Sequence, residues 1–147
     1  MTNPIVVCLI DDDTIYQFYM KKIIYALHKI NKVLSFGDGE EAAEFMESNI
    51  SNSSELPNII FLDINMPIMD GWEFLDEYAK LKPKIDKKIT LYMLSSSNDE
   101  KDIERAKKIN EVSDFLVKPI TPDQLEEILK VLKLEGNEPN LPIIVSN

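Results

Sequence analysis

The chain has 147 residues, enough for one domain with a sizeable hydrophobic core, and its 44% apolar content is ordinary for a globular protein. Its 26 acidic and 16 basic side chains give a formal charge of −10, which argues against direct binding to the phosphates of DNA or RNA. No apolar run approaches the roughly 20 residues of a membrane-spanning helix, and residues 1–4 lack the basic and apolar regions of a secretion signal, so we expect a cytoplasmic protein with no membrane contact.

Short apolar runs and amphipathic stretches alternate five times along the chain. The first run, Ile5 to Ile10, is apolar throughout, as expected for a parallel strand covered on both faces. A helical pattern follows each run; Met20, Ile24 and Leu27, for example, have the i, i+4, i+7 spacing of one buried helix face. The five runs are residues 5–10, 33–36, 58–62, 89–94 and 114–117. This alternation predicts an α/β domain of the doubly wound (βα)5 type, a five-stranded parallel sheet flanked by helices, as in flavodoxin-like folds.

Several helix starts carry recognisable capping residues. Three have the spacing of a capping box, in which Ser or Thr is followed three residues later by Glu or Gln. The pairs are Thr14 with Gln17, Ser97 with Glu100, and Thr121 with Gln124. Asp70, directly before a glycine, is interpreted as a turn or capping residue.

Polar side chains follow four of the five predicted strands at the point where each strand ends. They are Asp11, Asp12 and Asp13 after the first strand, Asp63 after the third, Ser95 after the fourth and Lys118 after the fifth. The carboxyl ends of parallel strands meet at one edge of the sheet, where ligands of such folds bind, so we expect these side chains to converge. The second strand ends in Gly37 and Asp38 instead and is predicted to lie away from the site.

This set of residue types favours one chemistry. Asp11, Asp12 and Asp63 repel one another unless a cation lies among them. Carboxylate oxygens without His or Cys suit Mg²⁺, which accepts carboxylates together with a phosphate. A carboxylate beside Mg²⁺ can attack a phosphoryl group and form an aspartyl phosphate, whose remaining oxygens the Lys118 ammonium and the Ser95 hydroxyl can stabilise. The sequence therefore predicts Asp63 as a phosphate acceptor.

The same residues carry a family resemblance. The four segments are Leu9-Ile10-Asp11-Asp12-Asp13, Phe61 to Gly71 with the pattern D-x-x-M-P-x-M-D-G, Met93-Leu94-Ser95-Ser96, and Phe115-Leu116-Val117-Lys118-Pro119. In this order and spacing they resemble the receiver domain of two-component response regulators, over about residues 5 to 134.

The resemblance implies a role for each position of the predicted site. Asp63 would be the phosphoacceptor, Asp12 would ligate Mg²⁺ directly and Asp11 mainly through water, and the main-chain carbonyl of Asn65 would complete the protein ligands.

The remaining implied roles concern the switch. Ser95 would be the switch hydroxyl, Lys118 would contact the phosphoryl group, and the peptide between Lys118 and Pro119 would be cis. Phe115 takes the aromatic switch position, where a ring without a phenolic oxygen can swing inward but cannot form a hydrogen bond at its tip.

Other polar or reactive residues have simpler interpretations. Asp13 is expected to be a loop or capping acid rather than a ligand, and Cys8 a small buried side chain. His28, late in the first predicted helix, is expected at the surface and not as a phosphohistidine.

The leading functional hypothesis is a stand-alone receiver, with residues 1–135 as the receiver domain and residues 136–147 as a tail without an output domain. By resemblance it would take its phosphoryl group from a sensor histidine kinase or a histidine phosphotransfer protein and slowly hydrolyse the product. It would reach a downstream protein through its fourth helix, fifth strand and fifth helix. Phosphorylation-dependent dimerisation is left open.

Two alternatives belong to other classes. A phosphatase with an aspartyl-phosphate intermediate typically carries a second acid two residues after the nucleophile, whereas this chain has Asn65, which cannot act as a general acid. A binding module that acts without phosphorylation is disfavoured because every chemical position is filled.

Overall fold

The computed structural model describes residues 5–27, 30 and 32–136. Within them, five strands form one parallel sheet in the order β2-β1-β3-β4-β5, which confirms the predicted doubly wound fold. The strands are β1 Val6–Ile10, β2 Lys32–Phe36, β3 Ile59–Asp63, β4 Thr90–Ser95 and β5 Asp114–Val117. The helices are α1 Thr14–Leu27, α2 Gly39–Ser48, α3 Gly71–Leu81, α4 Glu100–Lys107 and α5 Pro122–Gly136, with short 3-10 turns η1 Ser53–Glu55 and η2 Lys82–Lys84.

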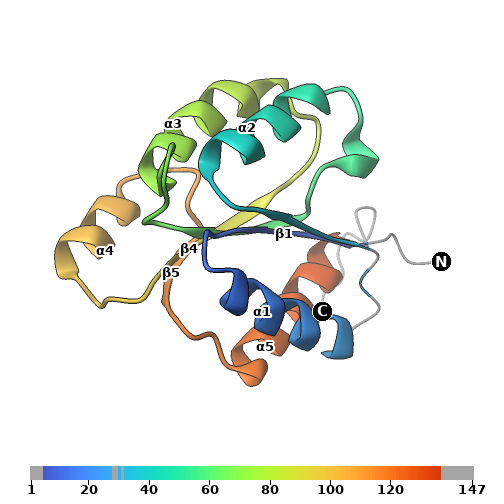
Figure 1. The fold of residues 1–147 in the computed structure, drawn as a ribbon. Helices are drawn as coiled ribbons and strands as arrows, with labels where there is room; N and C mark the ends of the chain where they lie inside the picture. Colours follow the sequence, from blue (N-terminus) through green and yellow to red (C-terminus); the bar gives the residue numbers. More distant parts are fainter. Residues whose placement is uncertain (1–4, 28–29, 31, 137–147) are drawn as a thin grey trace, which may run out of the picture.

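Helices cover both faces of the sheet (Figure 1). Helices α1 and α5 lie on one face, where Met20, Ile24, Leu125 and Leu129 are buried together. Helices α2, α3 and α4 lie on the other face and bury a second cluster that includes Phe74. Each of these large apolar side chains contributes roughly 1.5–3 kcal/mol when it is fully removed from water, so two apolar layers hold the helices against the sheet.

The depth of burial differs between the strands. All five residues of β1 and all five of β3 are buried, as their continuous apolar runs predict for central parallel strands. Strand β5 forms one edge of the sheet, and both its first and last residues, Asp114 and Val117, are exposed. The strand order reverses between β1 and β3, so a crevice opens at their carboxyl ends.

Two of the predicted helix caps are confirmed. Thr121 and Gln124 form reciprocal hydrogen bonds at the start of α5, of 2.9 and 3.1 Å. Asp70 caps α3 in a second capping box, with Glu73. A full capping box satisfies two backbone N–H groups that the first helical turn leaves without partners.

The other two predicted caps are wrong. Helix α1 is capped by Asp13, whose Oδ1 accepts bonds from the N–H groups of Ile15 and Tyr16, and not by Thr14. Helix α4 is capped by Asp99, and not by Ser97, and it ends at Lys107 rather than near residue 109. In both cases a carboxylate lies close to the predicted cap, and a charged acceptor binds backbone N–H groups more strongly than a hydroxyl does.

A few sequence interpretations fall on other parts of the chain. Cys8 is buried in the centre of β1, as expected, and burial raises the pKa of its thiol. His28 and the tail residues 137–147 lie outside the described residues. Among the residues that are described, no helix is both long and apolar enough to cross a membrane.

Candidate functional site

Strand β1 delivers two adjacent carboxylates to the crevice. Asp11 is 3% exposed, and its N–H donates to the carbonyl of Phe36, the last residue of β2, at 3.0 Å. Its Oδ1 accepts the N–H of Asp13 at 2.9 Å, which tightens the turn into α1. Asp12, the residue between them, is exposed. One carboxylate therefore points into the protein while its neighbour remains open to solvent.

Strand β3 delivers the third carboxylate. Asp63 is 6% exposed and lies between β1 and β4 at the centre of the sheet. The chain leaves the strand in a loop that closes on Gly71, whose N–H donates to the carbonyl of Ile64 at 2.8 Å. A Cβ at Gly71 would lie only 2.6 Å from the carbonyl oxygen of Asp63, so this close backbone approach requires glycine.

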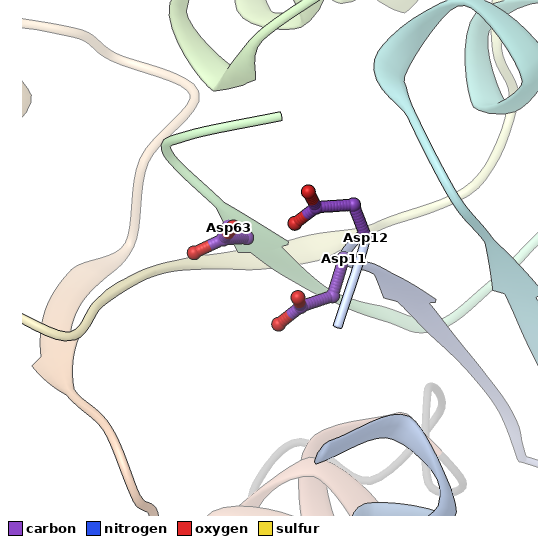
Figure 2. Close-up of side chains that lie close together, drawn as sticks. All are labelled: Asp11, Asp12 and Asp63. Atoms are coloured by element: carbon purple, nitrogen blue, oxygen red, sulfur yellow. The ribbon is translucent and has the colours of Figure 1, made fainter. Parts of the chain in front are cut away.

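The three carboxylates converge as predicted. One carboxylate oxygen from each of Asp11, Asp12 and Asp63 lies within 4.8 Å of the others (Figure 2). Lys118, at the end of β5, reaches into the same place, and its Nζ lies 2.8 Å from Asp11 Oδ2 and 3.4 Å from Asp63 Oδ1. Its peptide bond to Pro119 is cis, as the resemblance implied.

Burial and charge alter the acid–base properties of this cluster. Burial, with the nearby charge of Asp11, raises the pKa of Asp63 to about 6, although the Lys118 ammonium acts in the opposite direction. Burial alone would lower the pKa of Lys118, but the carboxylates of Asp11 and Asp63 outweigh it and raise that pKa. Asp63 is therefore ionised at neutral pH, but its proton affinity is unusually high for an aspartate.

The cluster fits a hard divalent cation. Its donors are carboxylate oxygens, without His or Cys, and the single positive charge of Lys118 cannot balance three carboxylates. Asp11 Oδ2 is buried, and within the described part of the chain its contact is the Lys118 charge, with no hydrogen-bond donor of ordinary geometry. A cation bound in the cluster would compete with Lys118 for this oxygen.

Ser95 and Asn65, the other predicted residues at these strand ends, differ in burial. Ser95 is 2% exposed at the end of β4; its Oγ accepts the N–H of Ser97 at 3.0 Å, and its carbonyl accepts the N–H of Lys118 at 2.8 Å. Asn65 is exposed, two residues after Asp63.

Phe115 lies apart from the carboxylates, in a groove between α4 and β5. The ring is partly buried and packs against the core under α4. Ile103, Ala106, Val112 and Val117 line the same groove.

One contact of the site could not be found by sequence reasoning. The ring of Tyr16, in the first turn of α1, faces the ammonium of Lys118 with 4.6 Å between Nζ and the ring centroid. The two residues are about 100 positions apart, and the only hint in the sequence is an aromatic residue closely following three aspartates.

Comparison with known proteins identifies the family. The sequence model of the family described as "Response regulator receiver domain" matches residues 7–130, and we conclude that the chain belongs to this family. The nitrate/nitrite response regulator protein NarL of Escherichia coli K12 is 34% identical over 131 residues, which are 88% of this chain and 54% of NarL. The chain thus spans about half the length of NarL and of several other curated relatives that it matches, and 83% of the length of another.

Solved structures of response regulators have the same fold as this chain. A two-component response regulator from Cytophaga hutchinsonii superposes with a TM-score of 0.78 at 30% identity, covering 88% of this chain and 97% of that one. The complex of CheX, CheY, BeF3 and magnesium from Borrelia burgdorferi contains a similar chain, with a TM-score of 0.71 at 26% identity and coverage of 87% and 89%. Receiver domains are signalling domains rather than enzymes that turn over an external substrate.

Proposed function

We propose that this chain accepts a phosphoryl group on Asp63 from a phosphohistidine of a sensor histidine kinase or a histidine phosphotransfer protein, and that Mg²⁺ is its cofactor. One observation carries the proposal: the buried Asp63 carboxylate shares a 4.8 Å cluster with two further carboxylates and lies 3.4 Å from an ammonium. The similarity to the Borrelia chain, whose complex contains BeF3 and magnesium, supports it.

Asp63 would act as the nucleophile. One of its carboxylate oxygens attacks phosphorus, the bond between phosphorus and the imidazole nitrogen breaks, and the imidazole keeps the electron pair and takes up a proton. Without a bound cation, burial and the charge of Asp11 raise the pKa of Asp63 to about 6, so the carboxylate is ionised at neutral pH and can act as the nucleophile.

Lys118 and Ser95 would receive the oxygens of the transferred group. The Lys118 ammonium already contacts Asp63, so a phosphoryl oxygen attached there comes within reach of its charge. Ser95 Oγ accepts a bond from Ser97, which leaves its own hydrogen to donate. Before the reaction Ser95 is fixed at the end of β4, and the Lys118 ammonium is placed by its ion pairs with Asp11 and Asp63.

Asp11, Asp12 and Asp63 would hold the cation, with the main-chain carbonyl of Asn65 as a further ligand. When bound, Mg²⁺ supplies positive charge to the carboxylates and to the phosphoryl oxygens. Asp11 is pre-oriented by the N–H of Asp13, so its position does not depend on the ion.

The signal would leave through protein contacts on α4, β5 and α5. Phe115 lies in the groove between α4 and β5, while Ser95 and Lys118 are joined by a backbone hydrogen bond between the ends of β4 and β5. A displacement of Ser95 toward the phosphoryl group would therefore reach the strand that carries Phe115. A downstream protein is expected on this face.

Labelling with acetyl phosphate tests the acceptor. Intact-mass spectrometry is expected to show one phosphoryl group on the wild-type chain in Mg²⁺, none in EDTA, and none on Asp63→Asn. The matched control is Asp76→Asn, an exposed aspartate on α3, which should be labelled like the wild type. Normal labelling of Asp63→Asn would overturn the proposal.

A further inference from the structure

Lys118 reaches the site from the edge of the sheet. It follows an edge strand of four residues that has one neighbouring strand, and its side chain is long and flexible. In the structure its ammonium is drawn to the carboxylates of Asp11 and Asp63. These are the groups that a divalent cation would also take, so binding of the cation weakens the attraction that positions the lysine.

Helix α1 supplies a support that does not depend on those carboxylates. The ring face of Tyr16 lies 4.6 Å from Lys118 Nζ, within the range of a cation–π interaction. The Tyr16 hydroxyl also accepts the N–H of Ile120 at 3.3 Å, and Tyr19, one turn further along α1, donates its hydroxyl to the Ile120 carbonyl at 3.3 Å. Ile120 is fully buried, and its backbone N–H and carbonyl are both bonded to side chains of α1.

We propose that Tyr16 is a positioning residue for Lys118: its ring face holds the ammonium, and its hydroxyl holds the segment after the lysine. The inference rests on the proposed function, because it concerns the lysine that would receive the transferred phosphoryl group. The ring quadrupole attracts the ammonium whether the carboxylates are free or bound to a cation, so it keeps the lysine in place when the competing charges are neutralised.

Packing alone does not explain the arrangement. A residue that only fills space beside Met20 and Leu9 could be leucine, whereas here a ring face meets a charge and a hydroxyl meets a backbone N–H. The ring face and the hydroxyl make different predictions, so they can be tested separately.

The test measures the rate of labelling by acetyl phosphate at saturating Mg²⁺. Tyr16→Leu removes the ring and is expected to slow labelling by about 3- to 30-fold, the range of one cation–π interaction. Tyr16→Phe keeps the ring and should stay within about threefold of the wild type. Phe18→Leu is the matched control, because Phe18 lies under Lys22 in an exposed cation–π pair on the same helix and should not affect the rate.

A spectroscopic readout separates positioning from general destabilisation. The ε-methylene protons of Lys118 should resonate upfield in the wild type and in Tyr16→Phe, because the ring current reaches them, and return to ordinary values in Tyr16→Leu. If Tyr16→Leu does not fold, pentafluorophenylalanine at position 16 keeps the shape of phenylalanine but reverses the ring quadrupole, and it should slow labelling relative to Tyr16→Phe.

The outcomes are distinguishable. Equal labelling rates for Tyr16→Leu and the wild type, or for the fluorinated and ordinary rings, would overturn the role of Tyr16 and leave the acceptor assignment intact. Absence of labelling in the wild type would instead contradict the proposed function.

Discussion

The two sides of the site are built differently. Strand β3 and helix α3 are closely packed: every residue of β3 is buried, and so are six of the eleven residues of α3. Strand β5 and helix α4 are packed less closely. Both ends of β5 are exposed, and Ala106 is the one buried residue among the eight of α4. The packed side carries Asp63, and the open side leads to Lys118.

The difference shows how each group is held in place. Asp63 is held by backbone packing, which leaves no room even for a methyl group at Gly71. Lys118 is held by a few polar contacts, with Ser95, Tyr16 and the carboxylates, and these can exchange without unfolding the strand. Asp63, the proposed acceptor, thus lies on the closely packed side of the molecule, and Lys118, which would contact the transferred group, follows the more exposed side.

The largest expected effect on the free energy of unfolding comes from a substitution on the packed side. Gly71→Ala places a Cβ against the backbone of Asp63 and Ile64, neither of which can move without shifting the strand, so we expect a loss of about 2–3 kcal/mol in the free energy of unfolding. Gly37→Ala is the control, since nothing lies within 4 Å of a Cβ there, and it should change stability by less than about 0.5 kcal/mol. Urea denaturation measures both, and equal effects would contradict the close backbone approach at Gly71 that holds the packed side together.

An intermediate effect on the free energy of unfolding is expected from the buried charge of the Asp63 carboxylate. Because the pKa of Asp63 is raised from 3.8 to about 6, the folded chain binds this proton more tightly than the unfolded chain. The carboxyl group therefore costs stability above pH 6, and that cost disappears as the pH falls below about 4. Asp63→Asn should be more stable than the wild type by about 1–3 kcal/mol at pH 7.5 in EDTA.

Denaturation curves across the pH range test this expectation. The advantage of Asp63→Asn should shrink as the pH is lowered, and adding Mg²⁺ should reduce it at pH 7.5 by stabilising the wild type through binding. Asp76→Asn, whose carboxyl group is exposed, should show no such pH dependence. A variant that is less stable than the wild type at pH 7.5 in EDTA would show that burial of Asp63 is already compensated.

The smallest effect is expected where the two sides meet. The guanidinium of Arg105 on α4 lies over the ring of Trp72 on α3, 4.2 Å from the centroid to Cζ. Arg105→Gln removes this contact and should lower stability by about 0.5–1 kcal/mol, as measured by urea denaturation. Lys101→Gln, on the same helix, is the control for the loss of one positive charge. Equal changes in the two variants would mean that charge and not the ring contact links α4 to α3.

Sequence reasoning predicted the fold well because the relevant signals are local. The five apolar runs mark all five strands to within one residue, and the residues that follow them identify one edge of the sheet. The caps at Asp70 and Thr121 were predictable for the same reason. The predicted caps at Thr14 and Ser97 were wrong, because a nearby aspartate competed in each case. The interpretation of Asp13 as a loop or capping acid is confirmed, and Gln17 instead donates to the carbonyls of Asp11 and Phe36.

The composition of the site was predictable, but its contacts were not. Strand ends place Asp11, Asp63 and Lys118 together, yet the preference of Lys118 for Asp11, 2.8 Å against 3.4 Å, depends on the path of β5 and the loop after it. The support from Tyr16 depends on the angle at which α1 crosses the sheet. Such details are set by tertiary packing and leave no periodicity or spacing in the sequence.

Trp72 lies where it can serve as an intrinsic fluorescent probe of the contact between α3 and α4. It is the sole tryptophan of the chain, so all tryptophan fluorescence of the protein comes from one indole ring. That indole is 9% exposed on the packed side and has a guanidinium from the open side against its face. A movement of α4 that separates Arg105 from Trp72 would take a positive charge away from this ring, so we expect the tryptophan fluorescence of the unlabelled protein to report such a movement.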